Sequence, residues 1–202
     1  MRAPFELWWG RRLFKDARGK RIATVFGSAR CTSDSPFYQV GVHTGAALAR
    51  AQWVTLTGGG PGVMEAANKG AFEAGGHSLG CNITLPFEQN ANPYLHRVFT
   101  CDYFFTRKFL LIAFSDAFIF LPGGLGTLDE FFEVVTLLQT NKVPPLPVIL
   151  VGREFWAPLT DWISGPLLHH KLLDQASTKL FQIVETPQEA VAILQKYEFK
   201  NG

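Results

Sequence analysis

Positions 121–130 read Leu-Pro-Gly-Gly-Leu-Gly-Thr-Leu-Asp-Glu, a glycine-rich segment between two apolar ones. The preceding run, 117–120, is typical of a buried strand, and the following run, 131–138, has the apolar period of a helix. A glycine-rich turn from a strand into a helix leaves backbone N–H groups free at the positive end of the helix dipole. The sequence therefore predicts an anion site here, with phosphate as the expected ligand.

Two further turns of small and polar residues follow strand-like runs. The run 53–56 leads into Thr57-Gly58-Gly59-Gly60-Pro61-Gly62, and the run 22–26 leads into Gly27-Ser28-Ala29-Arg30. Because ligands bind outside the carboxyl ends of the strands in an open parallel sheet, these ends predict a nucleotide-sized cleft at one edge. The second glycine cluster lacks the G-x-G-x-x-G spacing, which disfavours a dehydrogenase.

Strand-like and helix-like segments alternate along the rest of the chain. Further strands are expected near 77–85, 97–103, 147–151 and 181–184, and helices near 38–51, 63–68, 106–114, 155–163 and 187–197. The alternation predicts a Rossmann-like, doubly wound α/β fold, with a mainly parallel sheet and helices on both faces. We expect a single nucleotide-binding domain over 21–202, preceded by an N-terminal arm over 1–20.

Composition excludes several classes of protein. The 202 residues are 47% hydrophobic, enough for one substantial core, and the formal net charge is only +2. Dispersed Lys and Arg give no nucleic-acid footprint, and no apolar run reaches membrane-spanning length. The cysteines, Cys31, Cys81 and Cys101, fit reduced thiols better than disulfides or a metal site. We therefore expect a cytoplasmic protein with no metal, no membrane and no nucleic-acid partner.

The arm carries an apolar stripe made of Trp8, Trp9, Leu13 and Phe14. Apolar surface of this size usually marks an interface when it is exposed. We therefore expect the stripe to pack on the body of the protein or on a second subunit. The helix over 131–138 is apolar nearly all round, which favours the second subunit, although both features are also compatible with the core of a monomer.

Glu130 is open to two interpretations. Thr127 and Glu130 have the spacing of a capping box, in which a Thr caps the helix and an acid lies three residues later. The alternative is a functional carboxylate that the helix dipole keeps ionised, able to bind sugar hydroxyls or to face a developing cation. The glycine loop before Glu130 and the Arg107-Lys108 pair upstream of it favour the second interpretation.

The pair Arg107-Lys108 opens a predicted helix, where cations oppose the helix dipole. A bound anion would relieve the conflict, and the arginine fork matches phosphate geometry. The simpler interpretation is a surface pair. The cluster Gly58-Gly59-Gly60 also has two interpretations: a tight turn without a ligand, or a backbone that approaches a ligand closely. Because glycine runs are entropically costly, the second interpretation is favoured.

Three motifs resemble, in order and spacing, the Lonely Guy family of cytokinin riboside 5'-monophosphate phosphoribohydrolases, often mislabelled as lysine decarboxylases. They are Gly-Gly-Gly-Pro-Gly-Val-Met-Glu-Ala at 58–66, the Arg-Lys pair at 107–108, and Pro-Gly-Gly-Leu-Gly-Thr-Leu-Asp-Glu at 122–130. The likeness runs from about Ile22 to Val151. The resemblance implies hydrolysis of the N-glycosidic bond of a nucleoside monophosphate to free base and ribose 5-phosphate, and a homodimer or a multiple of it, without a cofactor.

The resemblance also implies roles for individual residues. The catalytic pair would be Arg107 and Glu130, and the base would contact Glu88 and Thr136. The family's phosphate loop falls on Gly123, Gly124, Gly126 and Thr127. The turns and the Arg-Lys pair add Ser28, Gly58, Gly59, Gly60 and Lys108 to the expected phosphate- and ribose-binding set. Residues 104–106 read Phe-Phe-Thr where plant members have Met-His-Glu, which leaves the preferred base open.

The expected substrate is AMP or an N6-substituted AMP. Glu130 would bind ribose hydroxyls and position or activate water, while Arg107 would hold the phosphate or support the leaving base. The alternative is a nucleotide- or cofactor-binding carrier on the same fold with no turnover. Such a carrier needs the glycine loop but not both Arg107 and Glu130. A nucleotide-regulated interaction protein is a third hypothesis, which rests on the tryptophan-bearing arm alone.

Overall fold

The sheet runs through the whole molecule. The computed structural model describes residues 3–86 and 90–199, and within them the strands form a seven-stranded sheet of order β4-β3-β2-β1-β5-β6-β7 in which every neighbouring pair is parallel. The strands are β1 Ile22–Phe26, β2 Val54–Thr57, β3 Ser78–Ile83, β4 Arg97–Cys101, β5 Ala117–Phe120, β6 Val148–Val151 and β7 Gln182–Val184.

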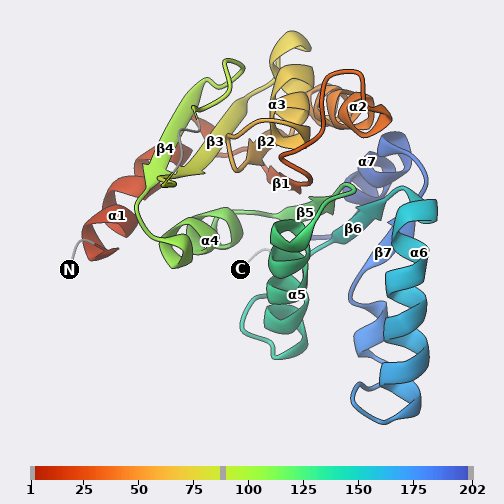
Figure 1. The fold of residues 1–202 in the computed structure, drawn as a ribbon. Coiled ribbons are helices and arrows are strands. Elements are labelled where there is room, and N and C mark those ends of the chain that lie inside the picture. The colour runs from red at the N-terminus through yellow and green to blue at the C-terminus, as the bar shows by residue number, and fades with distance from the viewer. Residues whose placement is uncertain (1–2, 87–89, 200–202) are drawn as a thin grey trace.

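Helices cover both faces of this sheet (Figure 1). The described helices are α1 Ala3–Gly10, α2 Pro36–Arg50, α3 Val63–Glu73, α4 Phe104–Ala113, α5 Leu125–Gln139, α6 Arg153–Trp162 and α7 Pro187–Lys196. One apolar cluster joins the sheet to α4, α5 and α6, and a second joins it to α2, α3 and α7. The predicted Rossmann-like, doubly wound α/β fold is therefore confirmed, with a sheet that is parallel throughout the described strands.

The chain changes direction across the sheet at β1. Strands β2, β3 and β4 lie on one side of β1, and β5, β6 and β7 lie on the other. The register pairs Phe26, at the end of β1, with Phe120, at the end of β5. A reversal of strand order opens a crevice at the carboxyl ends of the strands, where such folds bind ligands.

Ordinary local signals start the helices on the second face. Ser35 caps α2 by accepting a hydrogen bond from Phe37 N–H at 3.3 Å, with Pro36 in the first helical position. Thr186 caps α7 in the same way and is likewise followed by a proline. The helix expected near 187–197 is confirmed and begins at Pro187, where proline is favourable because it lacks the N–H that this position leaves unpaired.

The N-terminal arm is divided between the core and the surface. It consists of α1 and a 3₁₀ segment, Arg11–Ala17. Leu13 and Phe14 are buried in the same cluster as α4 and α5. Trp8 and Trp9 remain 50% and 48% exposed. The predicted apolar stripe therefore packs on the body of the protein through its second half only.

Candidate active site

A cavity of about 490 Å³ opens at the carboxyl ends of β1, β2 and β5. Its walls come from the turns after these strands and from the first turns of α4 and α5, and they include both Arg107 and Glu130. A larger cavity of about 780 Å³ lies at the opposite edge of the sheet, lined by Arg21, Gln52 and His77, which precede their strands. That larger cavity contains none of the predicted site residues, so the smaller one is the candidate site.

Backbone hydrogen bonds tie the turns around the cavity together. Ser28 N–H donates to Pro122 O at 3.1 Å, and Val63 N–H donates to Ser28 O at 2.8 Å. Gly62 stands between them at φ +71°, a conformation that side chains disfavour, and a Cβ there would overlap the carbonyl of Ser28. The glycine cluster at 58–62 thus serves close packing between two turns as well as the cavity.

The N-terminus of α5 faces the cavity without a side-chain cap. The helix begins at Leu125, and its cap residue is Gly124. Gly124 and Gly126 both line the cavity, and space is open around the Cα of each. The first N–H groups of a helix have no partner within it, so this end can bind an anion. Of the two interpretations of Thr127 and Glu130, the capping box does not hold: the helix starts two residues before Thr127, which lies in the first turn and is 5% exposed.

Arg107 reaches the cavity from the first turn of α4. Its Nε–H donates to the carbonyl of Cys81 at 2.9 Å, and its Nη2 lies 3.5 Å from the carbonyl of Gly58. A Cβ on Gly58 would overlap the guanidinium, so glycine is needed there for Arg107 to lie against β2. The remaining N–H groups of this planar fork are available to a phosphate or a leaving group.

Glu130 lies on the first turns of α5, half-buried in the cavity wall. Burial raises the pKa of Glu130 from its ordinary value of 4.5 to about 7, although the nearby positive charge of Arg107 works to lower it. The expectation that this carboxylate is kept ionised is therefore not met, because burial, which penalises the charged form, raises the pKa by more than the charge of Arg107 lowers it. A carboxyl with a pKa near neutrality can both hold and accept a proton at physiological pH.

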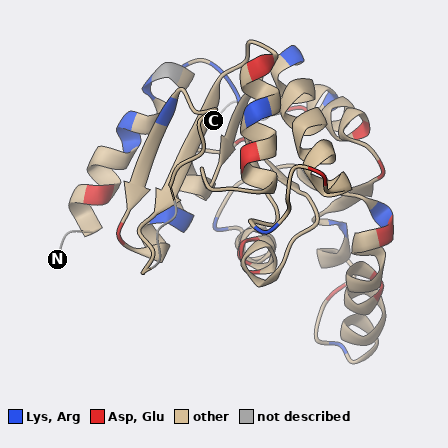
Figure 2. Ribbon diagram, turned by 45° about the horizontal axis from the view of Figure 1, so that its top comes forward, with Lys and Arg blue, Asp and Glu red and all other residues tan. Residues whose placement is uncertain are grey.

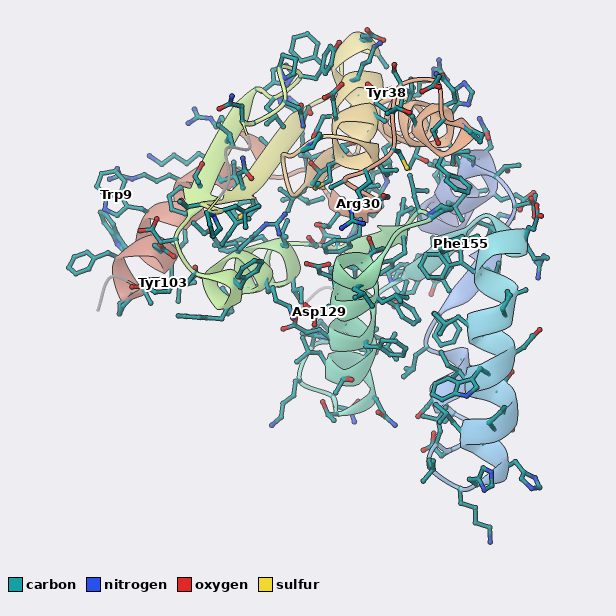
Figure 3. The ribbon with its side chains drawn as sticks, viewed as in Figure 1. Trp9, Arg30, Tyr38, Tyr103, Asp129 and Phe155 are labelled. Carbon is teal, nitrogen blue, oxygen red and sulfur yellow. The ribbon has the colours of Figure 1, made fainter. Side chains whose placement is uncertain are left out.

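Lys108 points away from the cavity, unlike Arg107. Its Nζ lies 2.9 Å from Asp129 Oδ2 and 2.7 Å from Glu133 Oε2, and the structure does not place it in the cavity lining. Figure 3 shows Asp129 on the side of α5 that faces α4. Successive residues of a helix point about 100° apart, so both members of the pair cannot face the same ligand. Lys108 joins α4 to α5 and so fixes the two helices that carry Arg107 and Glu130.

Of the three glycines after β2, only the first lines the cavity. Gly58 lines the cavity, whereas the structure places Gly59 and Gly60 outside its lining. The carbonyl of Gly59 accepts a 2.9 Å bond from Asn92 N–H, and that of Gly60 accepts a 3.1 Å bond from Asn92 Nδ2. Asn92 Nδ2 also donates to the buried Asn68 at 3.0 Å. These two glycines are therefore held against the loop at 90–94 and support the turn that carries Gly58.

Three of the four residues of the predicted phosphate loop line the cavity, together with Ser28 from the turn after β1. Gly124, Gly126, Thr127 and Ser28 all line the cavity. Gly123 lies directly behind them, packed so closely on Thr127 that a Cβ would overlap its side chain. Of the two expected base-binding residues, Thr136 is exposed, two turns further along α5 and outside the lining, and Glu88 lies outside the described residues.

The cavity also contains residues that the motifs did not identify. Arg30 lines it, and Figure 3 shows this side chain between α3 and the start of α5. Its place directly after β1, in a turn already expected at the cleft, was the available signal. Large apolar side chains lie at the mouth, with Phe104 58% and Leu125 87% exposed. Exposed apolar groups beside a polar cleft offer a surface for a planar, apolar ligand group.

The described residues hold no group of His, Cys, Asp and Glu that could bind a metal ion.

Figure 2 shows Lys and Arg interspersed with Asp and Glu over the ribbon. Among the helices of the described ranges, none combines the length and the apolar character needed to cross a membrane.

Comparison with known proteins gives the chain's family. A family model described as "Possible lysine decarboxylase" matches residues 64–194. The chain belongs to this family. A relative from Rhodococcoides fascians, named cytokinin riboside 5'-monophosphate phosphoribohydrolase, is 32% identical over 147 residues, which cover 71% of this chain and 74% of the relative. A relative of the same name from Mycobacterium tuberculosis is 29% identical over 180 residues, 87% and 94% of the two chains. The resemblance to the Lonely Guy family is confirmed.

Solved structures of similar fold include one titled as the molybdenum cofactor binding protein from Rippkaea orientalis. It has a TM-score of 0.65 and 25% identity, and the match covers 87% of this chain and 96% of that one. The Lonely Guy scaffold is thus shared with a protein whose title names binding rather than catalysis, so the chemistry has to be argued from the residues of the cavity.

The decarboxylase description of the family is not supported by this Lonely Guy chain. Amino-acid decarboxylation with pyridoxal phosphate needs a lysine that forms a Schiff base with the cofactor. No lysine is among the described residues that line the cavity, and Lys108 bonds to Asp129 and Glu133. The residues of the cavity therefore do not fit pyridoxal phosphate.

Proposed function

We propose that the chain is a nucleoside 5'-monophosphate phosphoribohydrolase, which cleaves AMP or an N6-substituted AMP to free base and ribose 5-phosphate. The observation that carries the proposal is the meeting of Arg107 and Glu130 in one cavity, next to the open N-terminus of α5. A carrier protein needs the anion site only. The relatives from Rhodococcoides fascians and Mycobacterium tuberculosis, which are named for the same activity, support the proposal.

The phosphate of the nucleotide is proposed to bind at the first N–H groups of α5, beside Ser28 and Thr127. The helix dipole and the unpaired amides favour an anion there. The phosphate takes no part in the cleavage of the glycosidic bond. Its binding energy instead positions the ribose against the reacting groups.

Cleavage of the glycosidic bond leaves a ribose with the character of an oxocarbenium ion. Glu130 is proposed to bind ribose hydroxyls and to accept a proton from water as the water oxygen bonds to C1'. The bond from C1' to the base breaks, and the base leaves with its electron pair and takes up a proton. Arg107 donates hydrogen bonds to the phosphate or to the departing base, and Phe104 and Leu125 offer the base an apolar surface.

A panel of nucleoside monophosphates tests this proposal, with release of free base measured by chromatography. AMP or an N6-substituted AMP should yield free base without added metal or organic cofactor. Adenosine should be a poor substrate because the anion site is then empty. Equal turnover of adenosine and AMP would refute the phosphate anchor, and no release of base from any nucleotide would refute the hydrolase.

The alternative is a nucleotide- or cofactor-binding carrier, which the structural likeness to a molybdenum cofactor binding protein favours. A carrier would bind a phosphorylated ligand in the same cavity and release it unchanged. Calorimetric binding of AMP without any release of base, under conditions in which the ligand stays intact, would select this alternative over hydrolysis.

Assembly as a homodimer and a cytoplasmic location remain part of the proposal. Large apolar side chains stay exposed on α1 and α4, including Phe5 at 68%, Phe105 at 59% and Phe109 at 51%. Exposed apolar surface of this kind is typical of an interface. The free thiols, two of them buried, are compatible with a reducing compartment. A mass of a single chain in light scattering, with full activity after dilution, would rule out the dimer.

A further inference from the structure

The N-terminal arm reaches the first turn of α4 through one buried carboxylate. Glu6, on α1, is 9% exposed, and its Oε1 accepts a 2.7 Å hydrogen bond from the backbone N–H of Asp102. Its Oε2 accepts a hydrogen bond from the hydroxyl of Thr106, which is fully buried. Burying a carboxylate is costly unless hydrogen bonds compensate it, so this is a specific attachment and not a solvated surface charge.

The attachment is made at a helix end that lacks a cap of its own. Tyr103, the cap residue of α4, makes no side-chain cap hydrogen bond. A carboxylate is favourable at the N-terminus of a helix, because it faces the positive end of the dipole. Figure 3 shows Tyr103 beside α1, which carries Trp9. Glu6 therefore brings a carboxylate from a distant part of the chain to the N-terminal end of α4, where it accepts from the N–H of Asp102 and the hydroxyl of Thr106.

A second contact fixes α1 along the same helix. Gly10 lies so close to Leu110 that a Cβ would overlap the leucine side chain. Leu110 is fully buried and belongs to the core that the arm joins through Leu13. Helix α1 is thus held to α4 at two points, Glu6 and Gly10, which keep the carboxylate of Glu6 in register with the first turn.

Arg107 belongs to the turn that Glu6 holds. It follows Thr106 directly, and its N–H donates to Tyr103 O at 3.2 Å. Its guanidinium extends from there to Cys81 O, at 2.9 Å from Nε. A movement of this turn would shift the guanidinium relative to Glu130, and misplacement by about 1 Å can cost a catalyst about a hundredfold in rate.

We propose that Glu6 is a positioning residue, which holds the first turn of α4 so that Arg107 faces the nucleotide cavity. Through this one side chain, α1 then helps to set the position of a residue of the site. The inference rests on the proposed function in one respect, the assignment of Arg107 to the substrate.

Glu6→Ala, Glu6→Gln and Thr106→Val test this role through AMP hydrolysis and calorimetric binding of ribose 5-phosphate. Glu6→Ala leaves the N–H of Asp102 without its acceptor, so we expect kcat to fall about ten- to hundredfold with a smaller change in KM. Glu6→Gln keeps an oxygen for Asp102 and turns an amide toward Thr106, so it should restore most of the activity. Thr106→Val removes one of the two attachments and should give an intermediate loss, which also tests the proposal if Glu6→Ala fails to fold.

Leu13→Ala is the matched control on the same arm. Leu13 is 3% exposed, so its truncation should lower the melting temperature while kcat per folded molecule stays unchanged. Unchanged kcat in both Glu6→Ala and Thr106→Val would overturn the proposal. So would an equal loss of kcat in Glu6→Ala and Leu13→Ala, since the effect would then be one of general stability.

A double-mutant cycle with Arg107→Lys separates this inference from the proposed function. If Glu6 acts through Arg107, Glu6→Ala should weaken ribose 5-phosphate binding in the unchanged protein and add little in the Arg107→Lys background. Equal losses in both backgrounds, or no loss in either, would overturn the positioning role. If the unchanged protein binds ribose 5-phosphate but hydrolyses no nucleotide, the hydrolase proposal fails. The cycle then still tests the positioning role of Glu6, because its readout is binding and not hydrolysis.

Discussion

Helices α5 and α7 carry the same four-residue pattern at their starts, and the structure uses it in opposite ways. At α7 the residues are Thr186-Pro187-Gln188-Glu189: Glu189 N–H donates to Thr186 Oγ1 at 3.2 Å, and Glu189 Oε2 accepts from Glu185 N–H at 2.9 Å. At α5 the residues are Thr127-Leu128-Asp129-Glu130, but the helix already begins at Leu125. There the pattern lies inside the helix, and Gly124 leaves the N-terminus open.

The difference separates a helix end that its own residues cap from one that we propose binds a ligand. Where the end of a helix only has to be stable, its own side chains satisfy the first N–H groups. At α5 no side chain caps the first N–H groups, and Glu130, the acid of the pattern, lines the cavity. Local rules are satisfied at α7 and broken at α5, as expected for a site that departs from the preferences of the fold.

The largest expected effect comes from removing one charge at each of the two helix starts. Glu130→Gln should lower the rate of AMP hydrolysis by about two to four orders of magnitude, because the group that accepts a proton is lost. Glu189→Gln should leave the rate unchanged, since an amide oxygen can still accept from Glu185 N–H. Base release by chromatography measures both rates, and circular dichroism checks folding. The melting temperature of Glu189→Gln should stay close to that of the unchanged protein, and that of Glu130→Gln should not be lower, because the variant removes a buried charge. A fully active Glu130→Gln protein would remove the functional distinction between α5 and α7.

The sequence predicted the sheet and its ligand-binding edge, because short apolar runs bounded by glycine turns show both where strands end and where they meet. It did not predict the start of α5. Gly126 is a poor helix former, and the Thr127 and Glu130 spacing favoured a later start. The open N-terminus became clear only from the structure, because the turns after β1 and β2 bring the rest of the cavity to it.

Properties that depend on distant parts of the chain were beyond the sequence. The pKa of Glu130 is raised mainly by burial among residues from four other segments of the chain. Arg107 and Lys108 look equivalent as neighbours, and only the packing of α4 on α5 shows that Lys108 turns to Asp129. Glu6 lies 96 positions before Asp102, and no local pattern links the two.

The pH dependence of the rate should follow the raised pKa of Glu130. The ionised carboxylate accepts the proton, so kcat/KM should fall about tenfold per pH unit below the pKa of about 7. A phosphate monoester also titrates near pH 6. The residual activity of Glu130→Gln therefore serves as the control profile, and it should lack the step near pH 7. The same step in both proteins would assign the titration to the substrate.

The stability of the folded protein gives a second measure of the same group. Between pH 4.5 and about 7 the folded protein holds a proton on Glu130 that the unfolded chain has released. The contribution of Glu130 to the free energy of unfolding therefore falls as pH rises through this window. Glu130→Gln should remove that decline in denaturant titrations, and an identical decline in the variant would contradict the raised pKa.

A smaller effect is expected from giving α5 the cap that α7 has. Gly124 has φ −95° and ψ −155° with open space around it, so it can accept a side chain without strain. Gly124→Asp would place a carboxylate on the free N–H groups, stabilise the helix by a few tenths of a kcal/mol to about 1 kcal/mol, and compete with the phosphate. We expect KM for AMP to rise about tenfold or more, which corresponds to a loss of about 1.4 kcal/mol in binding free energy. Gly124→Ala adds no acceptor and should change KM little; an equal rise in KM would point to a steric effect instead.

The smallest expected effect compares the two threonines. Thr186→Val removes the hydroxyl that caps α7, which should cost about 1 kcal/mol of stability and lower the melting temperature by about 2–4 °C. Thr127→Val changes a residue inside the first turn of α5, where the hydroxyl does not cap the helix, so its melting temperature should shift less. The kinetic effects should be reversed: only Thr127→Val should raise KM for AMP, because Thr127 lines the cavity and Thr186 does not. Suppose that Thr127→Val lowered the melting temperature as much as Thr186→Val and left KM unchanged. The hydroxyl of Thr127 would then cap α5, and the N-terminus of α5 would not be free to bind phosphate.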